Sequence, residues 1–215
     1  MQASELWFVR HGQTDWNVDQ RLQGHEDVPL NEAGRQQAAA AATYLQGLHA
    51  TARFDAIVSS DLSRALATAE AIRGALGITA IETDAGLREH ALGSLQGHVV
   101  RAMPPHLRRE YDNLRTNPDY KSPGGGESSR QMYERVVRTL DSLPQRYPGQ
   151  RVLVTTHGGW LFHAHRYLLQ LSIDRSQDAI PNACICIVRF EPSTRAWSIQ
   201  AWGVTDHLKQ AGCNG

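Results

Sequence analysis

The sequence predicts an α/β fold, a three-layer sandwich in which helices flank a mostly parallel central sheet. Short apolar segments that favour strands alternate along the chain with longer segments that favour helices, an order typical of parallel sheets with right-handed crossovers. The 215 residues are 41% hydrophobic and 20% charged, which is the ordinary balance of a globular chain with a sizeable core. We therefore expect a single domain over residues 1–215.

The first half of the chain is expected to supply three strands and two helices. The strands are expected at residues 5–9, 54–58 and 79–82, and the helices at 31–48 and 61–76. Asn31 and Asp61 begin the two helices. Their side chains can accept hydrogen bonds from the free N–H groups of a first helical turn, so each is expected to cap its helix.

The second half is expected to add two helices and three strands. The strands are expected at residues 151–156, 183–190 and 196–202, and the helices at 127–146 and from 158 through about 169. Residues 204–215 are expected to form a frayed tail. The strand at 196–202 would leave a sheet edge open, where a second copy of the chain could pair to form a homodimer.

Residues 87–126 fit the alternation of strands and helices poorly. They contain Pro104, Pro105 and Pro118, and they end in a glycine-rich return at residues 122–126. We interpret residues 90–126 as a partly helical flap, or cap, inserted over the C-terminal ends of the strands. Substrate specificity is expected to lie in this insertion, and the glycine-rich return would let it close over a bound ligand.

Composition excludes several classes of protein. The formal net charge is +0, which gives no reason to expect a nucleic-acid or membrane-surface partner. Three cysteines form no disulfide framework, and Cys184 and Cys186 are expected to be buried on the same side of one strand. The chain shows neither a secretory signal nor a membrane-spanning apolar run, so we expect a cytoplasmic protein. The phosphate-binding loop of nucleotide enzymes is also missing from the sequence.

Two expected strands end in a histidine followed by glycine, and ligands of open α/β sheets bind beyond such strand ends. His11-Gly12 follows the first strand, and His157-Gly158 follows the strand at 151–156. Glycine lets backbone N–H groups approach a ligand, a helix N-terminus favours an anion, and Arg10 adds a planar fork of donors. This combination suits phosphate, and neutral imidazole is a competent phosphoryl acceptor.

Six segments together resemble the histidine phosphatase superfamily, the phosphoglycerate mutase-like proteins. They occur in the family's order at residues 10–17 (RHGQTDWN), 24–34 (GHEDVPLNEAG), 59–69 (SSDLSRALATA), 87–97 (LREHALGSLQG), 125–128 (GGES) and 156–159 (THGG). The resemblance covers about residues 6–160. It implies the same α/β fold and a phosphoryl-transfer reaction on a small phosphorylated metabolite.

The resemblance also implies roles for individual residues. His11 would attack phosphorus, and Glu89 would protonate the leaving oxygen and later deprotonate the attacking water. The implied catalytic set is His11, Glu89, His157, Arg10 and Arg64. The implied substrate-binding set is Arg10, Asn17, Gln23, Gly24, Arg64, Glu89, His157 and Gly158. Fixed cations around the phosphoryl group would stabilise the transition state, so no metal or other cofactor is expected.

Three functions remain open at this point. After the glutamate, mutases of this superfamily typically carry an arginine and, two residues further on, a tyrosine, where this chain has His90 and Leu92. These departures favour hydrolysis over phosphoglycerate mutase activity, which is the first alternative. A non-catalytic phospholigand-binding protein is the second, although such relatives usually lose the nucleophile or the proton donor. No role is assigned to His25, His90, His98 or His106, nor to the arginines of the insertion.

Overall fold

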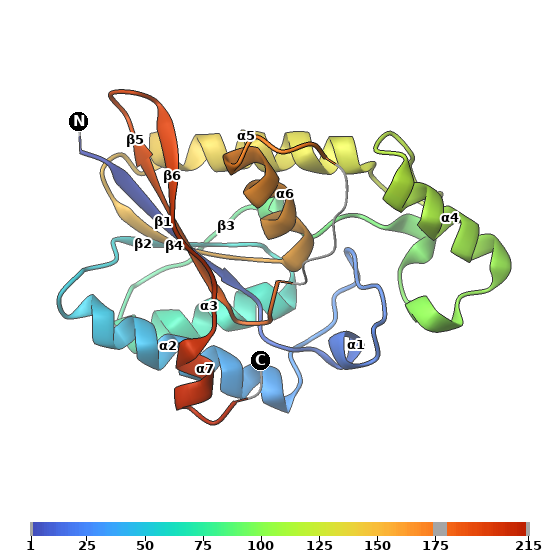
Figure 1. Cartoon of the computed structure of the whole chain (residues 1–215). Helices are drawn as coiled ribbons and strands as arrows, with labels where there is room; N and C mark the ends of the chain where they lie inside the picture. The colour runs from blue at the N-terminus through green and yellow to red at the C-terminus, as the bar shows by residue number, and fades with distance from the viewer. Residues whose placement is uncertain (1, 174–179, 214–215) are drawn as a thin grey trace.

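A computed structural model describes residues 2–173 and 180–213. Within these residues, a six-stranded sheet has the order β3-β2-β4-β1-β5-β6 (Figure 1). The strands are β1 (Ser4–Arg10), β2 (Ala56–Ser59), β3 (Glu82–Thr83), β4 (Arg151–Thr156), β5 (Ile185–Glu191) and β6 (Ala196–Val204). The first four run parallel, whereas β5 and β6 are antiparallel to their neighbours. The expected α/β sandwich with a mostly parallel sheet is confirmed.

Helices cover both faces of the sheet (Figure 1). They are α1 (Asp15–Val18), α2 (Glu32–His49), α3 (Ser63–Leu76), α4 (Pro105–Thr116), α5 (Ser129–Arg146), α6 (Gly158–Leu168) and α7 (Asp206–Gln210). Leu6 and Phe8 of β1 point into the core under α5 and α6, and Val9 points into the core under α2 and α3. Because successive side chains of a strand point to opposite faces of the sheet, this one apolar segment contributes to the hydrophobic core on both faces.

The central strand β1 lies between β4 and β5, and its position brings the two His-Gly segments together. Arg10 pairs with Thr156 in the register of β1 and β4, so His11 and His157 leave neighbouring strands at the same level. The backbone N–H of His11 also donates to Thr156 O at 2.9 Å. The convergence expected from the sequence therefore follows directly from the parallel register of these two strands.

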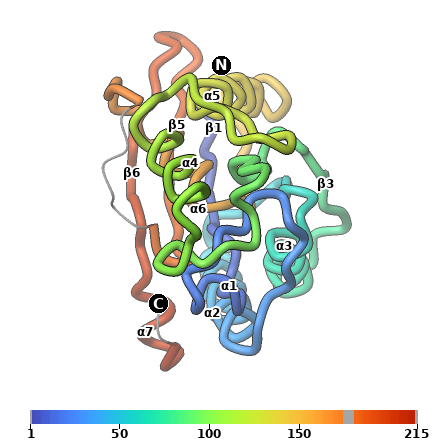
Figure 2. The backbone as a smooth tube through the Cα atoms, turned by 90° about the vertical axis from the view of Figure 1, so that its right-hand side faces the viewer, coloured from blue at the N-terminus to red at the C-terminus, as the bar shows by residue number. Residues whose placement is uncertain are grey.

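Residues 90–126 form short 3₁₀ turns and the helix α4, which project beyond the end of the sheet that carries the two histidines (Figures 1 and 2). A separate small cluster holds this segment together, with Leu92, Leu95, Leu107 and Leu114 buried against one another. The glycine-rich return at residues 122–126 packs directly against Gly93, because a Cβ at Gly93 would lie only 2.1 Å from Pro123 O. The insertion is therefore a packed unit beside the strand ends.

The start of helix α3 and the extent of strand β3 differ from the sequence predictions. Helix α3 begins at Ser63 with Leu62 as its N-cap, and Asp61 does not cap it. The carboxylate of Asp61 instead accepts two hydrogen bonds from Arg88, at 2.7 and 2.5 Å, because a guanidinium competes well for the same oxygens. Strand β3 covers only Glu82–Thr83, later and shorter than the expected residues 79–82.

Two short helices were not expected. Thr14 is the N-cap of helix α1, and its side chain and that of Asn17 form a reciprocal capping box. Helix α7 replaces part of the expected frayed tail, because Leu208 is buried and His207 Nε2 donates to Ala183 O at 3.0 Å. The final two residues of that tail lie outside the described residues.

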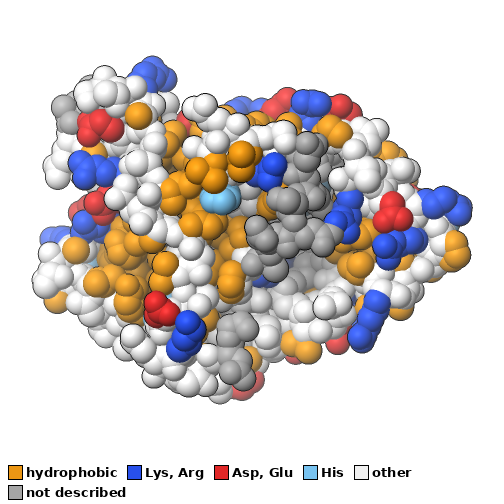
Figure 3. Space-filling view, viewed as in Figure 1, with side chains coloured by type: hydrophobic (Ala, Val, Ile, Leu, Met, Phe, Trp, Pro, Cys, Tyr) orange, Lys and Arg blue, Asp and Glu red, His pale blue; other side chains and the backbone are white. Residues whose placement is uncertain are grey.

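The face in Figure 3 carries the edge strand β6, and hydrophobic side chains gather there over β6 and α6. Trp202 of β6 stacks on His165 of α6, with ring centroids 4.6 Å apart. Pairing of this edge with a second copy of the chain stays a prediction. Among the described residues, no helix combines the length and hydrophobicity needed to cross a membrane.

Candidate active site

His11 follows the last residue of β1, and its ring is buried, with 2% of its surface exposed. The Nδ1 atom lies 2.7 Å from the carbonyl oxygen of Gly12. A carbonyl can only accept a hydrogen bond, so Nδ1 carries the proton and donates it. In the neutral ring the lone pair then resides on Nε2, which is the nitrogen available to attack an electrophile.

Burial and two nearby arginines keep the His11 ring neutral. Burial disfavours the imidazolium, and the positive charges of Arg10 and Arg64 repel it further, so the pKa of His11 lies well below its ordinary value of 6.5. The hydrogen bond to Gly12 opposes this shift without cancelling it. At neutral pH the ring is therefore uncharged and nucleophilic.

Arg64 and Arg10 place two guanidinium groups beside His11. Arg64 is fully buried in the first turn of α3, and it donates to Glu26 O and Gly24 O, each at 2.8 Å. Burial lowers the pKa of Arg64 to about 10, so the group stays charged. Arg10 donates to Ile180 O. Among the described residues, neither Arg10 nor Arg64 has a hydrogen-bond partner for its buried Nε–H, so both retain a donor for an anion.

His157 caps the start of α6, and its ring centroid is 5.1 Å from that of His11. Its Nε2 lies 2.8 Å from Ser60 Oγ, and within the described part of the chain its Nδ1 has no hydrogen-bond partner. Burial, followed by the charge of Arg64, holds the pKa of His157 well below 6.5. His157 is thus a second neutral ring, which can donate one hydrogen bond toward a ligand.

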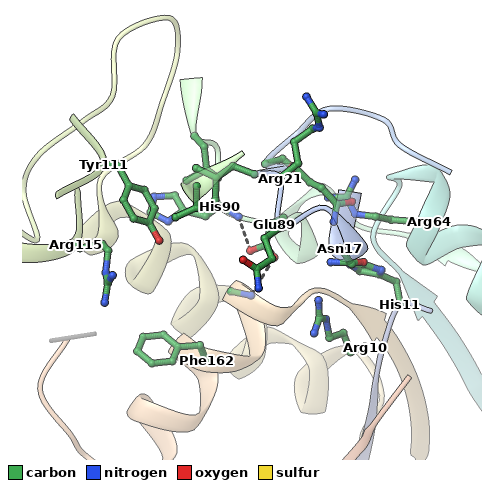
Figure 4. A pocket seen from close by; sticks show the side chains of 17 residues that line it. Arg10, His11, Asn17, Arg21, Arg64, Glu89, His90, Tyr111, Arg115 and Phe162 are labelled. Carbon is green, nitrogen blue, oxygen red and sulfur yellow. Dashed lines mark hydrogen bonds between the residues drawn. The ribbon is translucent and has the colours of Figure 1, made fainter. Parts of the chain in front are cut away.

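Glu89 lies on the opposite side of the site, after the 3₁₀ turn at Ala85–Leu87. Its Oε2 accepts from the backbone N–H of Gly159 at 3.0 Å, and its Oε1 accepts from that of His90 at 2.8 Å. A Cβ at position 159 would lie 2.1 Å from Oε1, so the carboxylate needs glycine there. In Figure 4 the carboxylate lies between His11 and the distal part of the cavity.

The loop that carries His11 and Gly12 is held in place by a close contact between two glycines. A Cβ on Gly12 would lie 2.3 Å from Gly34 O, and one on Gly34 would lie 2.0 Å from Gln13 O. The loop after β1 therefore packs directly on the first turn of α2. The family-like segment at residues 24–34 thus contributes a close backbone approach at Gly34.

These groups line a cavity of about 660 Å³ that extends from His11 to α4 (Figure 4). Six residues of the expected substrate-binding set line it, namely Arg10, Asn17, Gln23, Gly24, Arg64 and Glu89. His157 lies behind His11, and Gly158 packs under Arg10, where a Cβ would be 3.3 Å from Nε. The rest of the lining combines apolar side chains with polar and basic ones, namely Leu22, Leu92, Val100, Tyr111 and Phe162 with Gln20, Arg21, His90 and Arg115. The cavity is thus polar at His11 and mixed in character beyond Glu89.

Several residues that organise the site were missed by the sequence analysis. Asn182 Nδ2 donates to His11 O at 3.1 Å and to Asn17 Oδ1 at 3.3 Å. The backbone N–H and the hydroxyl of Thr14 also donate to Asn17 Oδ1. These three donors fix the orientation of the Asn17 amide, and its NH₂ group is available to a ligand in the cavity that Asn17 lines. Asn182 lies outside the family-like segments, and only its position just before a strand beside β1 could have indicated a role.

His25 and His90, which had no assigned role, contact the segment around Glu89. His25 Nε2 donates to Glu89 O at 2.8 Å, and His90 Nε2 donates to Glu127 O at 2.9 Å. Arg135 of α5 contacts the same segment through several carbonyl oxygens. The side chains of His25, His90 and Arg135 donate to backbone carbonyl groups, and such contacts leave no recognisable pattern in the local sequence.

The site is thus one in which a neutral histidine, two buried guanidinium groups and a carboxylate face a shared cavity. The sequence pattern that defines the histidine phosphatase superfamily (branch 1) matches residues 6–205. The chain therefore belongs to the histidine phosphatase superfamily, as its sequence predicted.

Individual proteins of known sequence or structure resemble the chain over nearly its whole length. It is 35% identical to phosphoglycerate mutase-like protein 4 of Arabidopsis thaliana, covering 97% of this chain and 89% of that protein. It is 33% identical to the metal-independent phosphoserine phosphatase of the same plant, covering 98% and 86%. The solved structure of Bacillus stearothermophilus YhfR has a TM-score of 0.85 and 28% identity, covering 95% of this chain and 99% of that one.

Proposed function

We propose that the protein is a metal-independent phosphomonoesterase that acts on a small phosphorylated metabolite through a phosphohistidine on His11. The observation that carries this proposal is the state of the His11 ring. Its Nδ1–H donates to Gly12 O, and burial with Arg10 and Arg64 keeps the ring neutral. The unprotonated Nε2 therefore lies beside two cations, which is the arrangement that in-line attack on a phosphoryl group requires.

The reaction divides into two displacements at phosphorus. In the first, the Nε2 lone pair of His11 forms the P–N bond, the ester P–O bond breaks, and Glu89 gives its proton to the leaving oxygen. In the second, Glu89 takes a proton from water, whose oxygen forms a new P–O bond as the P–N bond breaks. Free phosphate leaves, and His11 and Glu89 return to their starting states.

Positive charge and hydrogen-bond donors around the phosphoryl oxygens would stabilise both transition states. Arg10 and Arg64 supply fixed charge with spare Nε–H donors, and Asn17 and His157 supply neutral donors. The Gly12 carbonyl stabilises the His11 ring when phosphorylation makes it positive. Hydrogen bonds within the protein hold Arg64 and Asn17 in position, so little reorganisation is needed during the reaction.

The environments of His90 and Leu92 support water as the final acceptor. His90 is buried and donates to Glu127 O, and Leu92 packs against the insertion cluster of Leu95, Leu107 and Leu114. Neither position carries the arginine or tyrosine with which mutases of this superfamily bind the carboxylate of phosphoglycerate. Mutase activity is the second candidate, since Arg21 and Arg115 line the same cavity. It requires isomerisation of 3-phosphoglycerate that depends on a bisphosphate primer, and we expect no such turnover.

The cavity supports an organic substrate larger than phosphate. Its volume of about 660 Å³ lies in the range of small-molecule sites, and its distal part offers both apolar and basic side chains. The relative from Arabidopsis thaliana that is named a phosphoserine phosphatase is consistent with this class of substrate. The intact pair of His11 and Glu89 argues against a purely phospholigand-binding role.

Hydrolysis of p-nitrophenyl phosphate in the presence of EDTA tests the proposal. We expect full activity with the chelator, none in His11→Ala, and unchanged activity in His106→Ala, which removes an exposed histidine on α4. A quench with labelled substrate should trap an acid-labile phosphoprotein in the wild type only. Loss of activity on chelation, or turnover by His11→Ala, would refute the mechanism. Tight phosphate binding with no phosphoprotein would favour the non-catalytic alternative.

A further inference from the structure

Arg135 of α5 donates hydrogen bonds to three backbone carbonyls of one short segment. The acceptors are Gly86 O at 2.9 Å, Arg88 O at 2.8 Å and Glu89 O at 3.1 Å. Residues 88–91 lie outside any helix or strand. The carbonyls of Arg88 and Glu89 therefore lack the regular backbone partners that a helix or sheet would provide, and the guanidinium of Arg135 binds both of them together with Gly86 O.

Glu127 completes the contact from the other side. Its carboxylate accepts from Arg135 at 2.5 Å and from the backbone N–H of Ala91 at 3.0 Å. Its backbone N–H donates to Ala91 O at 2.9 Å, and its carbonyl accepts from His90 Nε2 at 2.9 Å. The side chains of Arg135 and Glu127 are only 19% and 16% exposed, so water screens this ion pair little.

Arg135 and Glu127 together form a clamp on the backbone that carries the Glu89 side chain. The tip of Glu89 is held by the N–H groups of Gly159 and His90, and its backbone is held by Arg135 and His25. Arg135 and Glu127 do not line the cavity, so they do not reach a ligand there. Burial raises the pKa of Glu127, but the hydrogen bond and charge of Arg135 outweigh it and lower that pKa overall. The pair therefore stays charged at neutral pH.

We propose that Arg135, paired with Glu127, is a positioning residue that holds Glu89 at the distance needed to protonate the leaving oxygen. The inference rests on the proposed function of Glu89 as general acid. A side chain that moves by about 1 Å can lose about 10²-fold in rate without losing its chemistry. Loosening the clamp should therefore weaken proton transfer selectively and leave attack by His11 unchanged.

The dependence of kcat/KM on the leaving group isolates this effect. Dinitrophenyl phosphate releases an anion that needs no proton, whereas phenyl phosphate releases one that does. We expect Arg135→Gln to lower kcat/KM for phenyl phosphate about tenfold more than for dinitrophenyl phosphate, because it weakens general-acid catalysis only in part. Glu127→Gln should shift the ratio in the same direction, and Glu89→Gln should shift it further. The ratio within one protein does not depend on how much of the sample is folded.

Two controls define the outcome. Arg138→Gln removes an exposed arginine of the same helix and should leave the ratio at the wild-type value. Arg135→Lys keeps the charge opposite Glu127 but cannot reach three carbonyls, so it should give an intermediate ratio. If Arg135→Gln lowers both substrates equally while Glu89→Gln shifts the ratio, the clamp is structural and the positioning proposal is wrong. If Glu89→Gln leaves the ratio unchanged, the proposed role of Glu89 fails first.

Discussion

The imidazole Nε2 of His157 lies 2.8 Å from Ser60 Oγ, and both side chains are fully buried. Ser60 directly follows β2, and His157 directly follows β4, so this hydrogen bond joins the ends of two paired strands. When Ser60 donates to Nε2, the proton of His157 resides on Nδ1, which has no other partner among the described residues. The tautomer that can donate to a phosphoryl oxygen is therefore the one in which Ser60 is the donor of this hydrogen bond.

Ser60→Ala should therefore lower activity as well as stability. We expect kcat/KM for a phosphomonoester to fall about tenfold, which corresponds to about 1.4 kcal/mol for one lost hydrogen bond in the site. Ser59→Ala is the matched control, because Ser59 is equally buried and contacts Thr155 instead of a histidine. Steady-state kinetics and urea unfolding separate the two effects. Equal activity of Ser60→Ala and wild type would contradict the prediction.

Gly159→Ala should reduce catalysis with little loss of stability. The added Cβ would lie 2.1 Å from Glu89 Oε1, at the mobile end of that side chain, so the carboxylate would move instead of the backbone. We expect the leaving-group dependence described for Glu89→Gln. Gly158→Ala places a Cβ 3.3 Å from Arg10 Nε and should be milder. Thermal unfolding together with kcat/KM for aryl phosphates checks this, and a larger effect at 158 would contradict it.

The free energy of unfolding should fall as the pH drops below about 6.5, the ordinary pKa of an unfolded histidine. The pKa of folded His157 lies well below this value, so at intermediate pH the unfolded chain binds a proton that the folded chain does not. Its contribution to the slope is about 1.4 kcal/mol per pH unit.

Urea unfolding of the wild type and of His157→Asn at several pH values below 6.5 measures this contribution. Asparagine keeps a side chain suited to the N-cap of α6 and does not titrate. We expect the variant to lose stability less steeply than the wild type as the solution is acidified. Parallel slopes would show that His157 titrates alike in both states.

Tyr111 and Phe162 line the distal cavity from α4 and α6, away from the phosphate end (Figure 4). Replacing either by alanine should raise KM for aryl phosphates about threefold to tenfold, because an aromatic contact contributes about 0.5 to 1.5 kcal/mol. Inhibition by inorganic phosphate should be unchanged, since phosphate occupies only the end near His11. An equal loss of affinity for inorganic phosphate would contradict this prediction, because the rings would then also affect binding at the end near His11.

Much of the fold and the centre of the site could be predicted because their signals are local. His11 and His157 each follow an apolar strand, so their convergence needed only a parallel register. Residues that act on distant backbone carry no such signal. Arg135 resembles any other arginine in a chain where all but two of the 22 basic residues are arginine, and the three backbone carbonyls that it binds lie more than 45 positions away.

Some predictions of where elements begin and end were wrong for the same reason. Asp61 has the residue type of a helix cap, but Arg88, 27 positions later, takes its carboxylate. The tail became a helix because Leu208 is buried and His207 is bound to Ala183. In each case a tertiary contact outweighed a local structural preference. Such a contact cannot be recognised from the neighbouring residues in the sequence.

The place of β1 between β4 and β5 also has a consequence during synthesis. Trp7 pairs with Leu153 on one side and with Ile187 on the other, so β1 leaves the ribosome long before either partner exists. Until then an apolar strand with two open edges must be kept from pairing with other chains. A nascent chain that stops short of β5 would already contain Arg64, Glu89 and His157, but one edge of β1 would remain open to pairing with other chains.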